Sequence, residues 1–156
     1  MKFHNSDLGL SIEVHPTLLQ ELYKKGLEHY PKEFGGLLVG RYSSDRKMVV
    51  LVATILPTRF KSSQYSFERG MQGVREILQE YYEQSPRLLY VGEWHTHPDG
   101  PAIPSATDIR ALQEITCHSE VHIENPVLLI LSLGNHGFEP VFFVHFQNRI
   151  YPYQKE

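Results

Sequence analysis

The most informative stretch of the chain runs from Glu93 to Asp108 and reads EWHTHPDGPAIPSATD. His95 and His97 are separated by one residue, and Asp108 follows after ten intervening residues. Imidazole nitrogens and a carboxylate are ligands that suit a divalent zinc ion, and three protein ligands leave a fourth position open for water. Because an open position distinguishes catalytic from structural zinc, the stretch predicts a metal-dependent hydrolase.

The expected local structure brings these side chains together. Residues 88–94 read as a strand that delivers the His-x-His pair, and residues two apart on a strand face the same side. A Pro/Gly-rich loop over residues 98–104 leads to a helix that begins near Ser105 and carries Asp108 in its first turn. Ser105 and Asp108 also fit a capping box, in which the acid only binds the backbone. The conjunction with His-x-His within fourteen residues favours the metal site.

A metal-dependent hydrolase needs a general base beside the attacking water. Glu93 stands two residues before His95, so its side chain should share the face of the ligands. Glu33 precedes a glycine-containing apolar run, residues 34–40, where the backbone could pass close to the site. Spacing alone leaves both glutamates open as the base.

The remaining segments predict a mixed α/β chain, α+β-like in its order of elements. Strands are expected over residues 8–14, 34–42, 48–56, 88–94, 127–133 and 138–146. Helices are expected from Pro16 to Pro31, from an N-cap at Ser66, and from Ser105. Residues 134–137 read Gly-Asn-His-Gly and predict a hairpin between the last two strands. The order predicts a curved mixed sheet flanked by helices in a single domain, residues 1–156.

Composition narrows the functional classes. The chain has 156 residues, 41% of them hydrophobic and 21% charged, as a globular domain does. A net charge of -3 without a basic run argues against nucleic acid and anionic membranes as partners. No apolar run reaches the roughly 18 residues of a membrane span. The first residues lack the apolar part of a secretory signal, so a cytoplasmic location is expected.

Other candidate residues receive plainer interpretations. The single cysteine, Cys117, excludes an internal disulfide and a cysteine-rich metal site. His145 is expected at the surface of a strand, and His118 and His122 are expected in solvent. Trp94 should point to the face opposite the ligands and belong to the core.

Taken together, these motifs resemble the JAMM (MPN-plus) family of zinc isopeptidases. The resemblance rests on Glu33, the run Gly35-Gly36-Leu37-Leu38-Val39-Gly40, the stretch His95-Thr96-His97-Pro98, Ser105 and Asp108. It covers nearly the whole chain in the family's order and implies an MPN/cytidine-deaminase-like architecture. The sequence around His95 is most similar to that of stand-alone bacterial members, some of which are encoded with antiphage nucleotide-signalling operons.

The resemblance also implies roles. His95, His97 and Asp108 would ligate Zn²⁺, Glu33 would activate the water, and Ser105 would hydrogen-bond the oxyanion. Glu93 then becomes a candidate hydrogen-bond partner of a ligating histidine. The implied substrate is a ubiquitin-like protein, cut after its C-terminal glycine, with associated activating and conjugating enzymes as further partners. Residues 57–65 and 116–125 are candidate contacts for its tail.

Two other interpretations remain open beside deconjugation. One is a catalytically silent scaffold of the same fold, which the intact ligand set disfavours. The other is trimming of a ubiquitin-like sulfur carrier or another precursor tail. A metallo-β-lactamase-type site is excluded because Gly100 stands where the last histidine would be. The chain is also too short for a (β/α)₈ amidohydrolase barrel.

Overall fold

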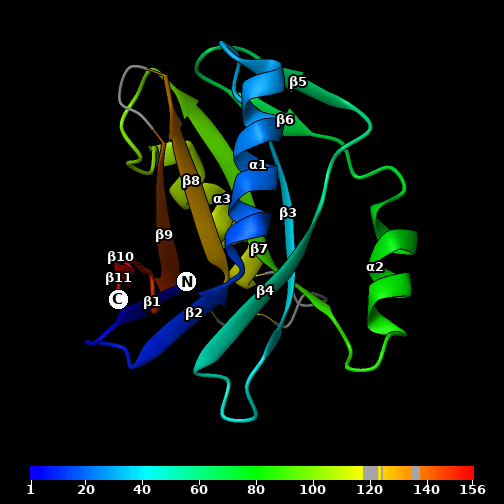
Figure 1. The fold of residues 1–156 in the computed structure, drawn as a ribbon, viewed down its shortest axis with the longest axis vertical. Coiled ribbons are helices and arrows are strands. Elements are labelled where there is room, and N and C mark those ends of the chain that lie inside the picture. Colours follow the sequence, from blue (N-terminus) through cyan, green and yellow to red (C-terminus); the bar gives the residue numbers. More distant parts are fainter. Residues whose placement is uncertain (118–122, 124, 135–137) are drawn as a thin grey trace.

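The computed structural model describes residues 1–117, 123, 125–134 and 138–156 (Figure 1). The helices of this part of the chain are α1 (Pro16–His29), α2 (Val74–Tyr82) and α3 (Ala106–Cys117). The strands are β1 (Lys2–Asn5), β2 (Leu10–Val14), β3 (Gly35–Tyr42), β4 (Met48–Ile55), β5 (Phe60–Ser62), β6 (Phe67–Arg69), β7 (Leu89–Pro98), β8 (Val127–Leu133), β9 (Glu139–Phe146), β10 (Arg149–Pro152) and β11 (Gln154–Lys155). None of the helices described has both the length and the apolar character that crossing a membrane requires.

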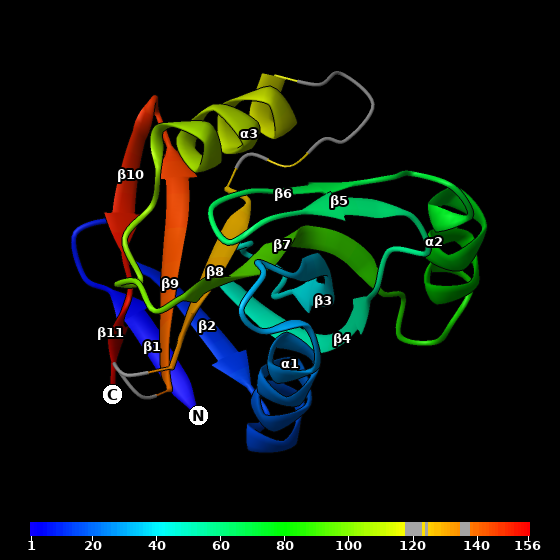
Figure 2. The ribbon, with the colours of Figure 1, turned by 90° about the horizontal axis from the view of Figure 1, so that it is seen from above.

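A curved mixed sheet dominates the described residues. Nine of their strands form it, in the order β10-β9-β8-β7-β3-β4-β2-β1-β11. The pairs β2–β4 and β7–β8 are parallel, and the other neighbours are antiparallel. Strands β5 and β6 form a separate two-stranded hairpin that lies beside β7 in the view from above (Figure 2). This arrangement confirms the predicted fold class.

The helices cover both faces of the sheet, and strand β8 shows this in its side chains. All seven β8 residues are buried, as the continuous apolar run in the sequence requires. Leu129 and Leu131 join the core that contains Leu22 of α1, whereas Leu128 and Ile130 pack with Leu112 of α3. On the α3 side of the sheet, α2 packs with a further apolar cluster from β3 and β4. The sheet is therefore buried between α1 on one face and α2 and α3 on the other.

Close approach of β3 to β7 depends on a missing side chain. Gly35 pairs with His95, and a Cβ atom at Gly35 would stand 2.1 Å from the carbonyl oxygen of Trp94. Contacts that short do not occur between real atoms, so any larger residue would push the strands apart. The glycine thus brings the start of β3, just after Glu33, against the strand that carries both histidines.

The expectation of a helix from Ser66 is wrong. Residues 67–69 form β6, and α2 begins only at Val74, after Gly73 in a left-handed conformation with φ of 75°. The later part of the expected apolar stripe, from Val74 to Tyr81, does lie on α2, whereas Phe67 fits the helical spacing by coincidence. Its ring packs against Phe34, with 5.7 Å between ring centroids. The predicted loop over residues 57–65 likewise contains strand β5.

The short strands β1, β10 and β11 were not expected from the sequence. They extend the sheet at its two edges, and Phe3 of β1 packs on Phe142 of β9 at 4.6 Å between centroids. His145 was expected at the surface but is buried, with 3% of its area exposed. Strand β9 is covered on both faces, so the polar character of His145 does not indicate a face in contact with solvent. The predictions for His118, His122 and the hairpin over residues 135–137 fall outside the described residues.

Replacing Gly35 tests the close approach of β3 and β7. Gly35→Ala should lower the free energy of unfolding by about 1–3 kcal/mol, because the strands must separate to admit a methyl group. Urea denaturation measures the difference. Gly100→Ala is the matched control, since a Cβ there meets nothing nearer than 3.9 Å. Equal stability of the two variants would contradict the packing argument.

Candidate metal centre and its groove

Strand β7 presents two different faces, which separate core residues from site residues. Trp94 and Thr96 are 1% and 0% exposed, and the Trp94 indole donates a 2.8 Å hydrogen bond to Thr54 Oγ1. Trp94 is therefore part of the core, as predicted. Glu93, His95 and His97 alternate with these residues and line a groove on the α3 side. The expected common face of the glutamate and the two histidines is confirmed.

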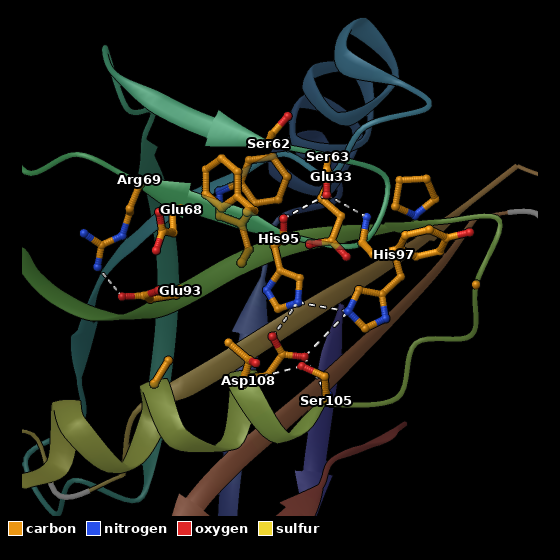
Figure 3. Close-up of a pocket in the computed structure, with 18 of the residues that line it drawn as sticks. Glu33, Ser62, Ser63, Glu68, Arg69, Glu93, His95, His97, Ser105 and Asp108 are labelled. Atoms are coloured by element: carbon orange, nitrogen blue, oxygen red, sulfur yellow. Dashed lines mark hydrogen bonds and ion pairs between the residues drawn. The ribbon is translucent and has the colours of Figure 1, made fainter.

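His95, His97 and Asp108 converge at this groove (Figure 3). The Nε2 atoms of the two histidines lie 3.0 Å apart. Asp108 Oδ1 is 3.2 Å from His95 Nε2, and Oδ2 is 3.6 Å from His97 Nε2. Tetrahedral zinc with ligand distances of about 2.0–2.1 Å holds its ligand atoms about 3.3 Å apart. The three groups thus stand close to the spacing that one metal ion requires.

The orientation of His97 also suits a metal ligand. Its Nδ1 lies 2.9 Å from the carbonyl oxygen of Pro101, to which it donates a hydrogen bond. This bond places the proton on Nδ1 and leaves the Nε2 lone pair for a metal. Burial lowers the pKa of His97, but Asp108 and the Pro101 carbonyl outweigh it and raise that pKa overall. A metal ion at the centre would displace any proton that His97 Nε2 shares with Asp108.

Asp108 serves the helix and the cluster together. The Ser105 amide donates to Asp108 Oδ2 at 2.7 Å, and the Asp108 amide donates to Ser105 Oγ at 3.1 Å. The capping box considered from the sequence therefore exists, and the same carboxylate also faces both histidines. Burial raises the pKa of Asp108, but hydrogen bonds from His95, His97 and the Ser105 amide hold that pKa well below its usual range. The acid is thus a carboxylate at neutral pH.

Glu33 reaches the same groove from another part of the sheet. It lies two residues before the start of β3, and its side chain lies near His95 and His97 in Figure 3. Its amide donates to the Ser63 carbonyl at 2.8 Å, which fixes its backbone to the β5–β6 hairpin. Burial raises the pKa of Glu33 despite the opposing charge of the histidines. A raised pKa is the property expected of a carboxylate that exchanges protons near neutral pH.

Within the described part of the chain, the partners of Glu93 are Arg69 and Tyr90, whereas a ligating histidine was the candidate partner from the sequence. The Glu93 carboxylate pairs with Arg69 of β6 and accepts a 3.0 Å hydrogen bond from the Tyr90 hydroxyl. Tyr90 reaches it because an extra residue, Val91, interrupts the ladder with β3 and returns Tyr90 to the groove face. Sequence reasoning missed Arg69 and Tyr90, although Gly92 beside the bulge was a usable signal.

Thr96 is a further residue that the sequence did not single out. It sits between the two histidines on the core face, and its Oγ1 accepts a 3.0 Å hydrogen bond from the Phe34 amide. The Thr96 amide in turn donates to the Phe34 carbonyl at 2.8 Å. These bonds tie β7 to the residue that follows Glu33, so they set the distance between the glutamate and the histidines.

The centre lies in a groove of about 740 Å³. One wall is formed by residues 61–69 of the β5–β6 hairpin, and the other by α3 through Ala111, Leu112 and Ile115. Residues 61–65 belong to the segment proposed from the sequence as a tail contact. The second proposed segment, residues 116–125, falls mostly on positions outside the described ones. Ser105 also lines the groove.

This fold, with a His-His-Asp cluster at a groove beside a half-buried glutamate, is the arrangement of a JAB-type domain. The family described as prokaryotic homologs of the JAB domain (Prok-JAB) matches residues 15–145. The chain belongs to this family. The matched range contains Glu33, both histidines, Ser105 and Asp108.

Similar proteins agree with this assignment. A CD-NTase/cGAS isopeptidase of Enterobacter hormaechei is 33% identical over 122 residues, which are 78% of this chain and 67% of that protein. A probable metalloprotease of Sinorhizobium fredii is 27% identical over 132 residues, 83% of this chain and 80% of that protein. A solution structure of a protein from Desulfitobacterium hafniense superposes with a TM-score of 0.64 at 22% identity, covering 90% of this chain and 88% of that one. The last likeness concerns the fold alone.

The Thr96 hydroxyl provides a test of how the site is built. Thr96→Val keeps the side-chain shape but leaves the Phe34 amide without its acceptor, so the free energy of unfolding should fall by about 1–3 kcal/mol. Thr96→Ser keeps the acceptor and loses only a methyl group, which costs about 0.8 kcal/mol. Thermal or urea denaturation of both variants measures the contrast. A valine variant as stable as the wild type would show that the hydrogen bond contributes nothing.

Proposed function

We propose that this protein is a zinc-dependent isopeptidase that cleaves after the C-terminal glycine of a ubiquitin-like protein and releases it from a target. The observation that carries the proposal is the convergence of His95, His97 and Asp108 beside Glu33 in a groove. Membership of the Prok-JAB family supports it. The relatives named as isopeptidase and probable metalloprotease support peptide or isopeptide hydrolysis as the reaction class.

The donor set fits zinc. Two neutral imidazoles and one carboxylate, with ligand atoms mutually within 4.8 Å, leave room for a fourth ligand from solvent or substrate. Calcium and magnesium prefer oxygen-only sites, so the two nitrogens favour zinc over either ion. When bound at such a site, zinc polarises a carbonyl group and lowers the pKa of water to about 7.

The residues of the chain then divide the remaining work. Glu33 accepts a proton from the attacking water at its carboxylate and passes it to the leaving lysine amine, as the C–N bond breaks and a carboxylate forms on the glycine. The Ser105 oxygen accepts from the Asp108 amide, so its hydroxyl hydrogen is free to be donated to the carbonyl oxygen that becomes negative. The groove wall of the hairpin and α3 orients the extended tail.

The choice of target is supported by the names of relatives. Three of them, from Enterobacter hormaechei, Vibrio cholerae and Pseudomonas aeruginosa, carry the name CD-NTase/cGAS isopeptidase. We therefore propose a conjugated CD-NTase within an antiphage operon as the target, with activating and conjugating enzymes that form the conjugate. Strands from both ends of the chain, β1 and β11, pair in the same sheet, which supports a single catalytic domain over residues 1–156.

Removing one ligand tests the metal centre. His97→Ala should abolish stoichiometric zinc binding and all hydrolysis, because two remaining ligands hold zinc weakly. Zinc content by elemental analysis and zinc titration by calorimetry measure the loss. His15→Asn is the matched control, because His15 is an exposed helix N-cap and asparagine caps equally well. Full activity of a metal-free His97→Ala preparation would overturn the assignment.

Replacing the base separates catalysis from metal binding. Glu33→Gln should retain zinc yet lose turnover by about 10²–10⁴-fold, since the amide cannot accept the proton. The substrate is a Gly-Gly-lysine probe: an extended peptide ending in Gly-Gly, joined to the ε-amine of a lysine, with a fluorophore and a quencher at its ends. Glu28→Gln, on the exposed side of α1, serves as control. Loss of zinc in Glu33→Gln would make Glu33 a ligand and contradict its role as base.

A second probe distinguishes deconjugation from precursor trimming. In this probe the Gly-Gly sequence continues through an ordinary peptide bond instead of the lysine side chain. Preferential cleavage of the Gly-Gly-lysine probe, followed by mass spectrometry, is expected of a deconjugating enzyme. Preference for the linear probe would replace deconjugation by maturation of a precursor.

A further inference from the structure

The β5–β6 hairpin forms a wall of the groove without belonging to the main sheet. Its own ladder pairs Phe60 with Arg69 and Ser62 with Phe67. No backbone ladder of the described residues joins it to β7, although both border the groove. The position of this wall relative to the histidines must therefore come from other contacts.

One set of contacts holds the turn end of the hairpin. The Ser63 carbonyl accepts the Glu33 amide at 2.8 Å. The Phe67 ring, next to the turn, packs on Phe34 at 5.7 Å between centroids. These contacts fix the end of the hairpin that lies nearest to the proposed base.

At the opposite, open end of the hairpin, the Phe60 ring of β5 packs on Phe34 at 5.2 Å between centroids, and an ion pair holds β6. Arg69, the last residue of β6, pairs with Glu93 of β7 in the wall of the groove (Figure 3). Their side chains are only 20% and 24% exposed, so solvent screens the pair far less than a surface pair. Tyr90 donates to the same carboxylate, and burial raises the pKa of its hydroxyl, which keeps it a donor.

Stability alone does not explain why an ion pair stands at this place. Partly buried charges lose hydration, and an apolar contact at the same place often stabilises a fold as well. Apolar neighbours are at hand, since Tyr90 already packs against the cluster of Leu37, Val39 and Leu88. What a charged, hydrogen-bonded contact adds over an apolar one is a fixed direction. Here the contact joins the hairpin, in a fixed orientation, to the strand that carries both histidines.

We propose that Arg69 and Glu93 are positioning residues that hold the end of β6 against β7 and thereby set the groove for an extended substrate chain. The inference rests on the proposed peptidase function. Neither side chain contacts the reacting atoms, so the pair acts on substrate binding and leaves the chemical step unchanged. Glu93 stands two residues before His95 on β7. The contact with Arg69 therefore holds the hairpin beside the metal ligands, although neither Arg69 nor Glu93 is a ligand.

The test uses the zinc-loaded full chain and the Gly-Gly-lysine probe. Arg69→Met should raise KM by about tenfold or more, the fold-change expected for losing a hydrogen bond to a charged group, with kcat and zinc content unchanged. Arg69→Lys keeps the charge and should recover part of the loss. The double variant Arg69→Met/Glu93→Gln should be no worse than the worse single variant, because both changes break one contact. Lys25→Met, which breaks the exposed Lys25–Glu28 pair, should change nothing.

A second measurement does not depend on cleavage. Hydrogen exchange should accelerate in Arg69→Met at the Gly70 amide, which is bonded to the Arg59 carbonyl at the open end of the hairpin, while β8 stays protected. Unchanged exchange there would overturn the proposal. So would a fall in kcat at constant KM, or additive effects in the double variant. If the wild type cleaves neither probe, the proposed function fails, and the exchange result alone decides whether the pair positions the hairpin.

Discussion

The alternation of side chains along β7 is the constraint on which the rest of the site depends. The strand must place Trp94 and Thr96 in the core and His95 and His97 in the groove. A slip of one residue against β3 would reverse the two sets, burying the imidazoles and exposing the indole. Gly35 and the hydrogen bonds between Phe34 and Thr96 fix this register at the level of the histidines. Core packing and the metal centre are therefore two outcomes of one strand pairing.

The parts of the structure that the sequence predicted are those governed by local rules. The strands expected over residues 88–94 and 127–133 are present as β7, which continues to Pro98, and as β8, which is buried on both faces. The spacing from His97 to Asp108, with a loop and a helix start between them, was sufficient to bring the ligands together. The choice of Glu33 over Glu93 was not local, since it depends on how β3 pairs with β7. Only the family resemblance favoured Glu33 before the structure placed it in the groove.

The features that the sequence did not reveal depend on contacts between distant segments. Phe67 fits a helical stripe as well as an aromatic contact with Phe34, and only the packed structure distinguishes them. The bulge at Val91 turns Tyr90 toward Glu93, and an alternating pattern cannot predict an inserted residue. His145 was expected at the surface but is buried, because β9 is covered on both faces. The sequence of one strand does not show which other segments cover it.

The shared carboxylate of Asp108 has a consequence for the order in which the domain assembles. Its Oδ2 atom accepts the Ser105 amide and closes the first turn of α3, and its two oxygens also face the imidazoles of His95 and His97 on β7. Occupation of the centre by an ion and formation of this helical turn would thus be reciprocally linked, because each would make the other more favourable. A chelator would act as a local denaturant of this turn, and metal supply during synthesis would govern how soon the α3 wall of the groove becomes ordered.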